Sequence, residues 1–128
     1  MNLYVIGPVT GRENGNREEF LRVRAILREA GHRAEIPHSA VSPDTSWQAA
    51  MGKSISMMLN TTSSGNLLYE AIAMLDGWEH SKGARIEHDL AEALGIECRP
   101  WREWLNPAED GASIAGGDAS QPIFAPAC

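Results

Sequence analysis

The sequence of 128 residues contains few cysteines, few aromatic residues and no long apolar run. Cys98 and Cys128 are its two cysteines, and they lack the CxxC spacing expected of a disulfide framework or a cysteine-based zinc site. No segment approaches the roughly 18 consecutive apolar residues that a membrane-spanning helix needs. The first residues, MNLYVIGPVTG, lack the basic flank of a signal peptide. We therefore expect a cytoplasmic protein that does not bind a membrane.

Basic residues are also too few for a surface that binds nucleic acid. The chain has 11 Lys and Arg against 17 Asp and Glu, giving a net charge of −6, whereas binding to a phosphate backbone relies on a basic face. A small anion is compatible with this charge, because a helix N-terminus and one arginine can bind a phosphate. The histidines lack metal-ligand spacing, so the sequence indicates neither a metal site nor a cofactor.

The order of apolar segments predicts an α/β fold with a small parallel sheet. Short runs rich in β-branched and aromatic residues predict four strands, and amphipathic segments between them predict three helices. This alternation is typical of a Rossmann-like (flavodoxin-like) three-layer sandwich. The strands are predicted in NLYVIG, HRAEIP, YEAIAML and IECRPW, and the helices in residues 16–31, 46–59 and 81–95. We assign the domain to residues 1–104 and expect the Gly-, Ala-, Pro- and Ser-rich residues 105–128 to form an extended or disordered tail.

Two details of the helices follow from the same patterns. Asn16, with Glu19 three residues later, is a predicted N-cap of the first helix. The third helix is expected to bury the apolar residues that recur at helical spacing, which are Ile86, Leu90, Ala93 and Leu94.

In parallel α/β sheets, ligands bind beyond the carboxyl ends of the strands. GPVTGREN follows the first predicted strand, so Gly7, Pro8 and Arg12 are candidates for binding an anion. The glycines match neither GxGxxG nor a P-loop, and a plain tight turn is the simpler interpretation.

HSKGARIE, at the start of the third predicted helix, indicates a binding site more specifically. Ser81 stands where the helix begins, and Gly83 permits close approach of a ligand to the backbone. A helix N-terminus favours negative charge, so a phosphate fits there. Glu87 follows one turn later and can face the same pocket. The alternative is that Ser81 is only an N-cap and Glu87 only a favourable acid near the helix start.

LYVIGPVTG and AIAMLDGWEHSKGARIEHDLAEALG together resemble the DUF4406 family, over about residues 1–101. This mostly phage and bacterial family is related to nucleoside 2-deoxyribosyltransferases and 2′-deoxynucleoside 5′-phosphate N-hydrolases. The resemblance implies that Glu87 is a nucleophile that displaces the base from the sugar, and that Tyr4 orients it. Ser81 and Gly83 match the phosphate loop of the hydrolases, which implies a 5′-monophosphate substrate.

Cleavage of an N-glycosidic bond also calls for a second acid, because the leaving base needs a proton. Asp76, after the third predicted strand, is the first candidate, and Asp44 is a poorer one. Asp76 is equally suited to cap the DGW turn. Trp78 and Trp47 are candidates for stacking on the base, although burial in the core is the more common role of tryptophan.

The sequence therefore favours one function and is compatible with two alternatives. The first is an N-glycosidase that hydrolyses the base–sugar bond of a (deoxy)nucleoside 5′-monophosphate. The alternatives are a nucleoside 2-deoxyribosyltransferase and a non-catalytic module that binds or sequesters a signalling nucleotide. Whether Tyr4 and Glu87 meet in space separates the enzymes from the module. We expect a nucleotide or nucleoside as the partner, no nucleic acid polymer, a homodimer, and the host cytoplasm if the protein is phage-encoded.

Overall fold

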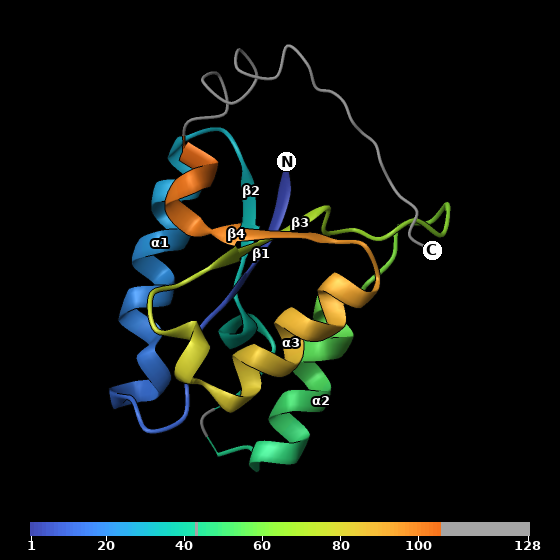
Figure 1. Ribbon diagram of the computed structural model, residues 1–128. Helices are drawn as coiled ribbons and strands as arrows, with labels where there is room; N and C mark the ends of the chain where they lie inside the picture. Colours follow the sequence, from blue (N-terminus) through green and yellow to red (C-terminus); the bar gives the residue numbers. More distant parts are fainter. Residues whose placement is uncertain (43, 106–128) are drawn as a thin grey trace.

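The computed structural model describes residues 1–42 and 44–105 (Figure 1). Four strands alternate with three helices, and short 3-10 turns occur at Glu13–Asn16, Pro37–Ser39, Trp78–His80 and Trp101–Leu105. In chain order the main elements are β1 (Asn2–Ile6), α1 (Arg17–Glu29), β2 (Arg33–Glu35), α2 (Trp47–Met58), β3 (Ala71–Met74), α3 (Lys82–Ala93) and β4 (Glu97–Pro100). Residues 106–128, which include most of the predicted tail, lie outside the described residues. None of the helices within the described ranges has the length and apolarity needed to cross a membrane.

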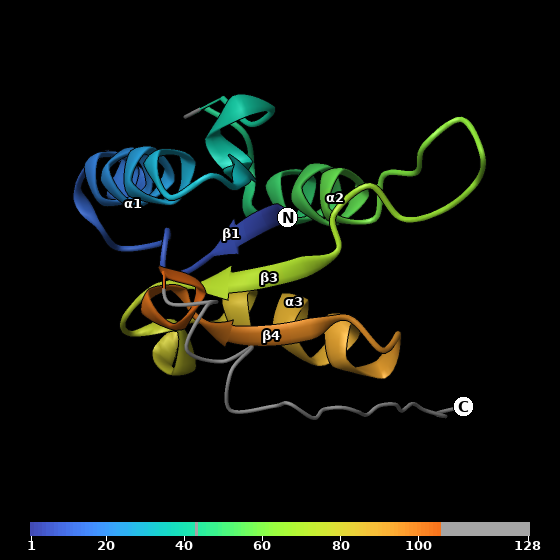
Figure 2. The same ribbon diagram turned by 90° about the horizontal axis from the view of Figure 1, so that it is seen from above.

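The strands form one parallel sheet in the order β2-β1-β3-β4. Figure 2 shows β1, β3 and β4 side by side with their arrows pointing the same way. The chain moves outward from β1 to β2 and then returns past β1 to β3, so the strand order reverses between β1 and β3. Such a switch point leaves a crevice at the carboxyl ends of the two strands. The predicted α/β, Rossmann-like (flavodoxin-like) class is confirmed.

Side chains alternate between the two faces of the sheet, and each face is covered by helices. Leu3 and Val5 of β1 belong to the cluster that contains α1, together with Trp101 and Trp104 of the last turn. Tyr4 of β1 belongs to the opposite cluster, which contains residues of α2 and α3. Figure 1 shows α1 on one side of the strands and α2 and α3 on the other. The sheet is therefore the middle of three layers.

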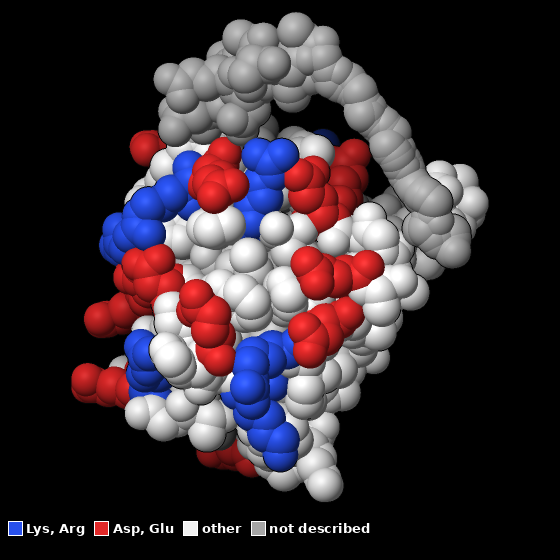
Figure 3. All heavy atoms as spheres, viewed as in Figure 1, with Lys and Arg blue, Asp and Glu red and all other residues white. Residues whose placement is uncertain are grey.

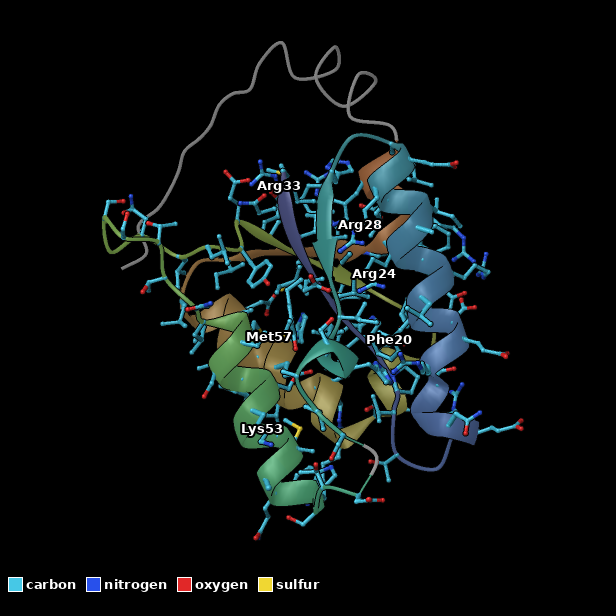
Figure 4. All side chains as sticks on the ribbon, turned by 180° about the vertical axis from the view of Figure 1, so that it is seen from behind. Phe20, Arg24, Arg28, Arg33, Lys53 and Met57 are labelled. Atoms are coloured by element: carbon cyan, nitrogen blue, oxygen red, sulfur yellow. The ribbon has the colours of Figure 1, made fainter. Side chains whose placement is uncertain are left out.

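Arginines of α1 fasten that helix to the edge strand β2. Figure 4 shows Arg24 and Arg28 reaching from α1 toward β2, with Phe20 pointing inward from the same helix. Arg24 Nη1 lies 2.9 Å from Glu35 Oε1, and Arg28 Nη2 donates to the Ala34 carbonyl at 2.9 Å. On the face seen in Figure 3, Lys and Arg side chains lie among Asp and Glu and form no single basic surface.

Asn16 precedes α1, but its side chain makes no capping hydrogen bond. Asn14, Gly15 and Asn16 all have left-handed backbone conformations, with φ of 51°, 62° and 61°. In this conformation the Asn16 side chain points back to the loop after β1, where Nδ2 donates to the Pro8 carbonyl at 3.0 Å. The predicted N-cap interaction is therefore wrong, because the bond that forms closes the loop instead of the helix.

The predicted buried stripe of α3 is confirmed only at Leu90, which packs partly buried against the core, whereas Ala93 is exposed. Ile86 is 39% exposed and Leu94 51% exposed. The helix instead buries the small residues Ala84 and Ala91 and, between them, Glu87. These three residues are three or four positions apart, so they share one face of α3, and that face is the buried one.

Candidate functional site

A cavity of about 500 Å³ lies at the carboxyl ends of the strands, beside the switch point. Its walls come from the loop after β1, the turn after β2, one face of α2 and the first turns of α3. On α2, the lining residues Trp47, Ala50, Met51 and Ser54 share a face because they lie three or four residues apart. Sites for small molecules typically enclose about 300–1,000 Å³, so this cavity has the size of a small-molecule site.

Glu87 lines the cavity although it is almost fully buried, with 5% of its surface exposed. Burial raises the pKa of its carboxyl group to about 7, and a hydrogen bond from Ser54 acts in the opposite direction. Ser54 Oγ donates this bond to Oε2. Oε1 accepts no hydrogen bond from the described residues. One carboxylate oxygen is therefore held and the other is unengaged beside the cavity.

Tyr4 reaches Glu87 through Ser54. The Tyr4 hydroxyl lies 2.7 Å from Ser54 Oγ, in a buried contact between β1 and α2. Burial, together with the charge of Glu87, raises the pKa of Tyr4 far above its ordinary value. Tyr4 and Glu87 therefore lie close together, and Ser54, which was not predicted from the sequence, connects them by hydrogen bonds. The available signal was that Ser54 stands four residues before Met58, a buried position on the same helix face.

Ser81 and Gly83 line the same cavity. Ser81 Oγ accepts from the backbone N–H of Ala84 at 3.2 Å, so Ser81 is the N-cap of α3. A Cβ atom on Gly83 would lie 2.9 Å from Sδ of Met51 on α2, so a larger residue there would displace the Met51 side chain. At the same helix end, Lys82 Nζ lies 4.7 Å from the centre of the Trp47 ring.

The loop after β1 contributes only part of the predicted set. Gly7 lines the cavity, whereas Pro8 and Arg12 are not among its lining residues. Pro8 is buried, and the exposed Arg12 lies over Gly77, where a Cβ atom would be 3.2 Å from its Nη2. Among the lining residues that the structure describes, the one Lys or Arg is Arg17, at the start of α1.

Asp76 and Trp78 lie outside the cavity lining, as does the exposed Asp44. Asp76 Oδ1 and Oδ2 accept from Arg102 at 2.8 and 3.0 Å on the surface, and this pairing lowers the pKa of Asp76. The Trp78 ring packs on His88 with centroids 4.4 Å apart. Glu87 is thus the sole carboxylate among the described residues that line the cavity.

His38 lines the cavity from the turn after β2. Its Nε2 lies 2.7 Å from the Gly15 carbonyl, which can only accept, so Nε2 carries the proton. Nδ1 is buried and has no hydrogen-bond partner among residues 1–42 and 44–105, and burial lowers the pKa of the ring. The described residues contain no group of three or more His, Cys, Asp or Glu that could hold a metal ion.

A family model described as a domain of unknown function (DUF4406) matches residues 1–99. No curated protein and no solved structure matches the chain. The matched span runs from β1 into β4 and includes every residue of the Tyr4–Ser54–Glu87 chain. The protein therefore belongs to the DUF4406 family.

Proposed function

We propose that the protein is an N-glycosidase that hydrolyses the base–sugar bond of a (deoxy)nucleoside 5′-monophosphate, with Glu87 as the nucleophile. The observation that carries the proposal is one buried carboxylate on the wall of a cavity of small-molecule size, with one oxygen held by Ser54. The motif resemblance to nucleoside 2-deoxyribosyltransferases and 2′-deoxynucleoside 5′-phosphate N-hydrolases supports the same chemistry.

The reaction proceeds in two displacements. Glu87 Oε1 bonds to the anomeric carbon while the carbon–nitrogen bond breaks and its electron pair leaves with the base. The base takes a proton from solvent, since the described lining offers no second carboxylate. Water then attacks the glycosyl-enzyme, loses a proton and releases (deoxy)ribose 5-phosphate and the Glu87 carboxylate.

Burial of Glu87 is chemically useful in this scheme. The transition state carries positive charge on the sugar, and a carboxylate in a low-dielectric site stabilises that charge more strongly than it would in water. The attack requires the ionised form, so kcat/KM should rise as pH passes through the Glu87 pKa of about 7.

The start of α3 is the proposed phosphate site. Ser81 occupies the Ala84 N–H, which leaves other first-turn N–H groups available to an anion. Ser81 and Glu87 are separated by roughly 9 Å along the helix at 1.5 Å per residue. A pentose 5-phosphate can span this separation. Lys82 adds positive charge at this helix end, and Arg17 adds it on the cavity lining.

The deciding experiment is base release from a panel of ribo- and deoxyribonucleoside 5′-monophosphates and the matching nucleosides, followed by chromatography. The proposal expects release from monophosphates that is abolished in Glu87→Ala. Glu92→Gln is the matched control, because Glu92 is on the same helix with its side chain 62% exposed. A new nucleoside on addition of a second base would indicate transfer. Nucleotide binding without release, retained in Glu87→Gln, would replace the enzyme with a binding module.

A further inference from the structure

A chain of three buried polar groups runs from the sheet to the cavity. Tyr4 on β1 is 0% exposed, and Ser54 on α2 and Glu87 on α3 are each 5% exposed. Tyr4 is bonded to Ser54, and Ser54 to Glu87. The contacts join residues 50 and 33 positions apart, so the chain exists only because the three elements pack together.

The direction of these bonds follows from the hydrogen count. A serine hydroxyl has one hydrogen, and Ser54 gives it to Glu87 Oε2. The Tyr4 hydroxyl must then be the donor to Ser54 Oγ. The raised pKa of Tyr4 keeps that hydroxyl protonated. Each bond in such a chain polarises the next, so Tyr4 strengthens the bond from Ser54 to the carboxylate.

We propose that Ser54 is the positioning residue of Glu87: it holds Oε2, leaves Oε1 for the substrate and stabilises the ionised carboxylate. The catalytic consequence rests on the function proposed above. The effect on ionisation concerns the substrate-free protein and can be measured without any reaction.

Other groups near Glu87 do not replace Ser54 in this role. From α3 itself, the neighbouring His88 packs on Trp78 and lies 3.0 Å from Asp89. His38 from the turn after β2 and Arg17 from α1 line the same cavity, and His38 Nε2 is committed to Gly15. Burial raises the pKa of Glu87 and the Ser54 bond lowers it. Loss of the Ser54 hydroxyl therefore leaves burial unopposed by that bond.

The first test is a carbon-13 NMR pH titration of the glutamate carboxyl groups in substrate-free protein, with Glu87→Gln used to assign the Glu87 signal. In Ser54→Ala the Glu87 midpoint should move upward by about one pH unit, the size expected for one charge-assisted hydrogen bond. Ser56→Ala is the matched control, because Ser56 is exposed on the same helix. If the Ser54 hydroxyl contributed only to the stability of the fold, its removal would lower stability without moving the midpoint of the Glu87 titration.

A second variant keeps the inference testable if Ser54→Ala folds poorly. Tyr4→Phe retains the ring and removes the donor to Ser54, so the Glu87 midpoint should move upward by a smaller amount. Tyr69→Phe is its control, because the Tyr69 ring lies 5.3 Å from that of Tyr4 and its hydroxyl makes no hydrogen bond with the described residues. An unchanged midpoint in both Ser54→Ala and Tyr4→Phe overturns the inference.

Activity measurements separate this inference from the proposed function. In an active enzyme, Ser54→Ala should move the acid limb of the kcat/KM profile upward and lower kcat more than it raises KM. A midpoint that moves in a protein without base release leaves the Ser54 inference standing and removes the proposed function. Base release with an unmoved midpoint supports the proposed function and overturns the Ser54 inference.

Discussion

Gly7 lies in direct contact with Leu75: a Cβ atom on Gly7 would be 2.7 Å from the Leu75 Cβ atom and 2.9 Å from Cγ. The Leu75 N–H donates to the Ile6 carbonyl at 2.9 Å, which holds the exits of β1 and β3 together beside the cavity. The rigid stem of Leu75 cannot move aside as the end of a flexible side chain would. The glycine is therefore required by packing.

Gly7→Ala is expected to lower the free energy of unfolding by about 1–3 kcal/mol, the usual range for overpacking. Urea denaturation of purified protein measures this directly. Gly52→Ala is the matched control in α2, because a Cβ atom there meets nothing within 4 Å. That variant should gain roughly 0.5–1 kcal/mol from helix propensity. Equal stability of Gly7→Ala and wild type would contradict the close contact.

Glu87→Gln should stabilise the fold in a pH-dependent way. The folded-state pKa is about 7 against an ordinary 4.5. A raised pKa means that the folded state binds the proton more tightly than the unfolded chain does. The protonated Glu87 side chain therefore contributes fully to the free energy of unfolding below about pH 4.5, and this contribution is lost as pH rises through about 7. Glutamine stays neutral at every pH, so the free energy of unfolding of Glu87→Gln does not fall in this way as pH rises.

The gain in Glu87→Gln should be near zero around pH 4 and should reach about 3 kcal/mol above pH ~8. Denaturant unfolding across this range, with Glu92→Gln as control, measures the difference. A gain that is constant with pH would show that the Glu87 carboxyl titrates normally in the folded protein.

Much of the fold could be predicted from local patterns. The Phe20, Val23 and Leu27 spacing identified α1, and all three are buried. On α3 the same spacing was less reliable, because Leu90 packs against the core but the large apolar residues Ile86 and Leu94 are exposed. The buried face instead holds two alanines and a carboxylate. Hydrophobicity alone cannot place a charged group inside, and functional sites are where local rules are expected to fail.

The site was less predictable because side-chain directions depend on distant contacts. Strand order placed Asp76 at the right edge of the sheet, but its direction is set by Arg102, which lies 26 residues later in a 3-10 turn. Ser54 joins the site because α2 packs where its hydroxyl can bond both Tyr4 and Glu87. Neither fact is encoded in the residues next to Asp76 or Ser54.

Asp76→Asn should leave base release unchanged, since Asp76 lies outside the cavity lining and is paired with Arg102. The side chains of the pair are 66% and 57% exposed, and exposed ion pairs add little to stability. The kcat and KM values and the thermal midpoint should therefore stay close to those of wild type. Glu87→Gln, which is expected to be inactive, is the negative control. Loss of turnover in Asp76→Asn would indicate that Asp76 is the second acid, which protonates the leaving base.

His38 should remain neutral, with its proton on Nε2, at pH values where an ordinary histidine is half charged. Burial lowers its pKa from 6.5, and the hydrogen bond to Gly15 fixes the tautomer. As pH falls, His38 becomes protonated in the unfolded chain at a higher pH than in the folded protein. The neutral, buried ring therefore contributes to stability above pH 6.5, and this contribution is lost as pH falls through the folded pKa. Long-range nitrogen-15 NMR of the ring, assigned with His38→Gln, distinguishes both the charge and the tautomer. A midpoint at or above 6.5, or a proton on Nδ1, would mean that the turn after β2 does not bury this ring against the loop after β1.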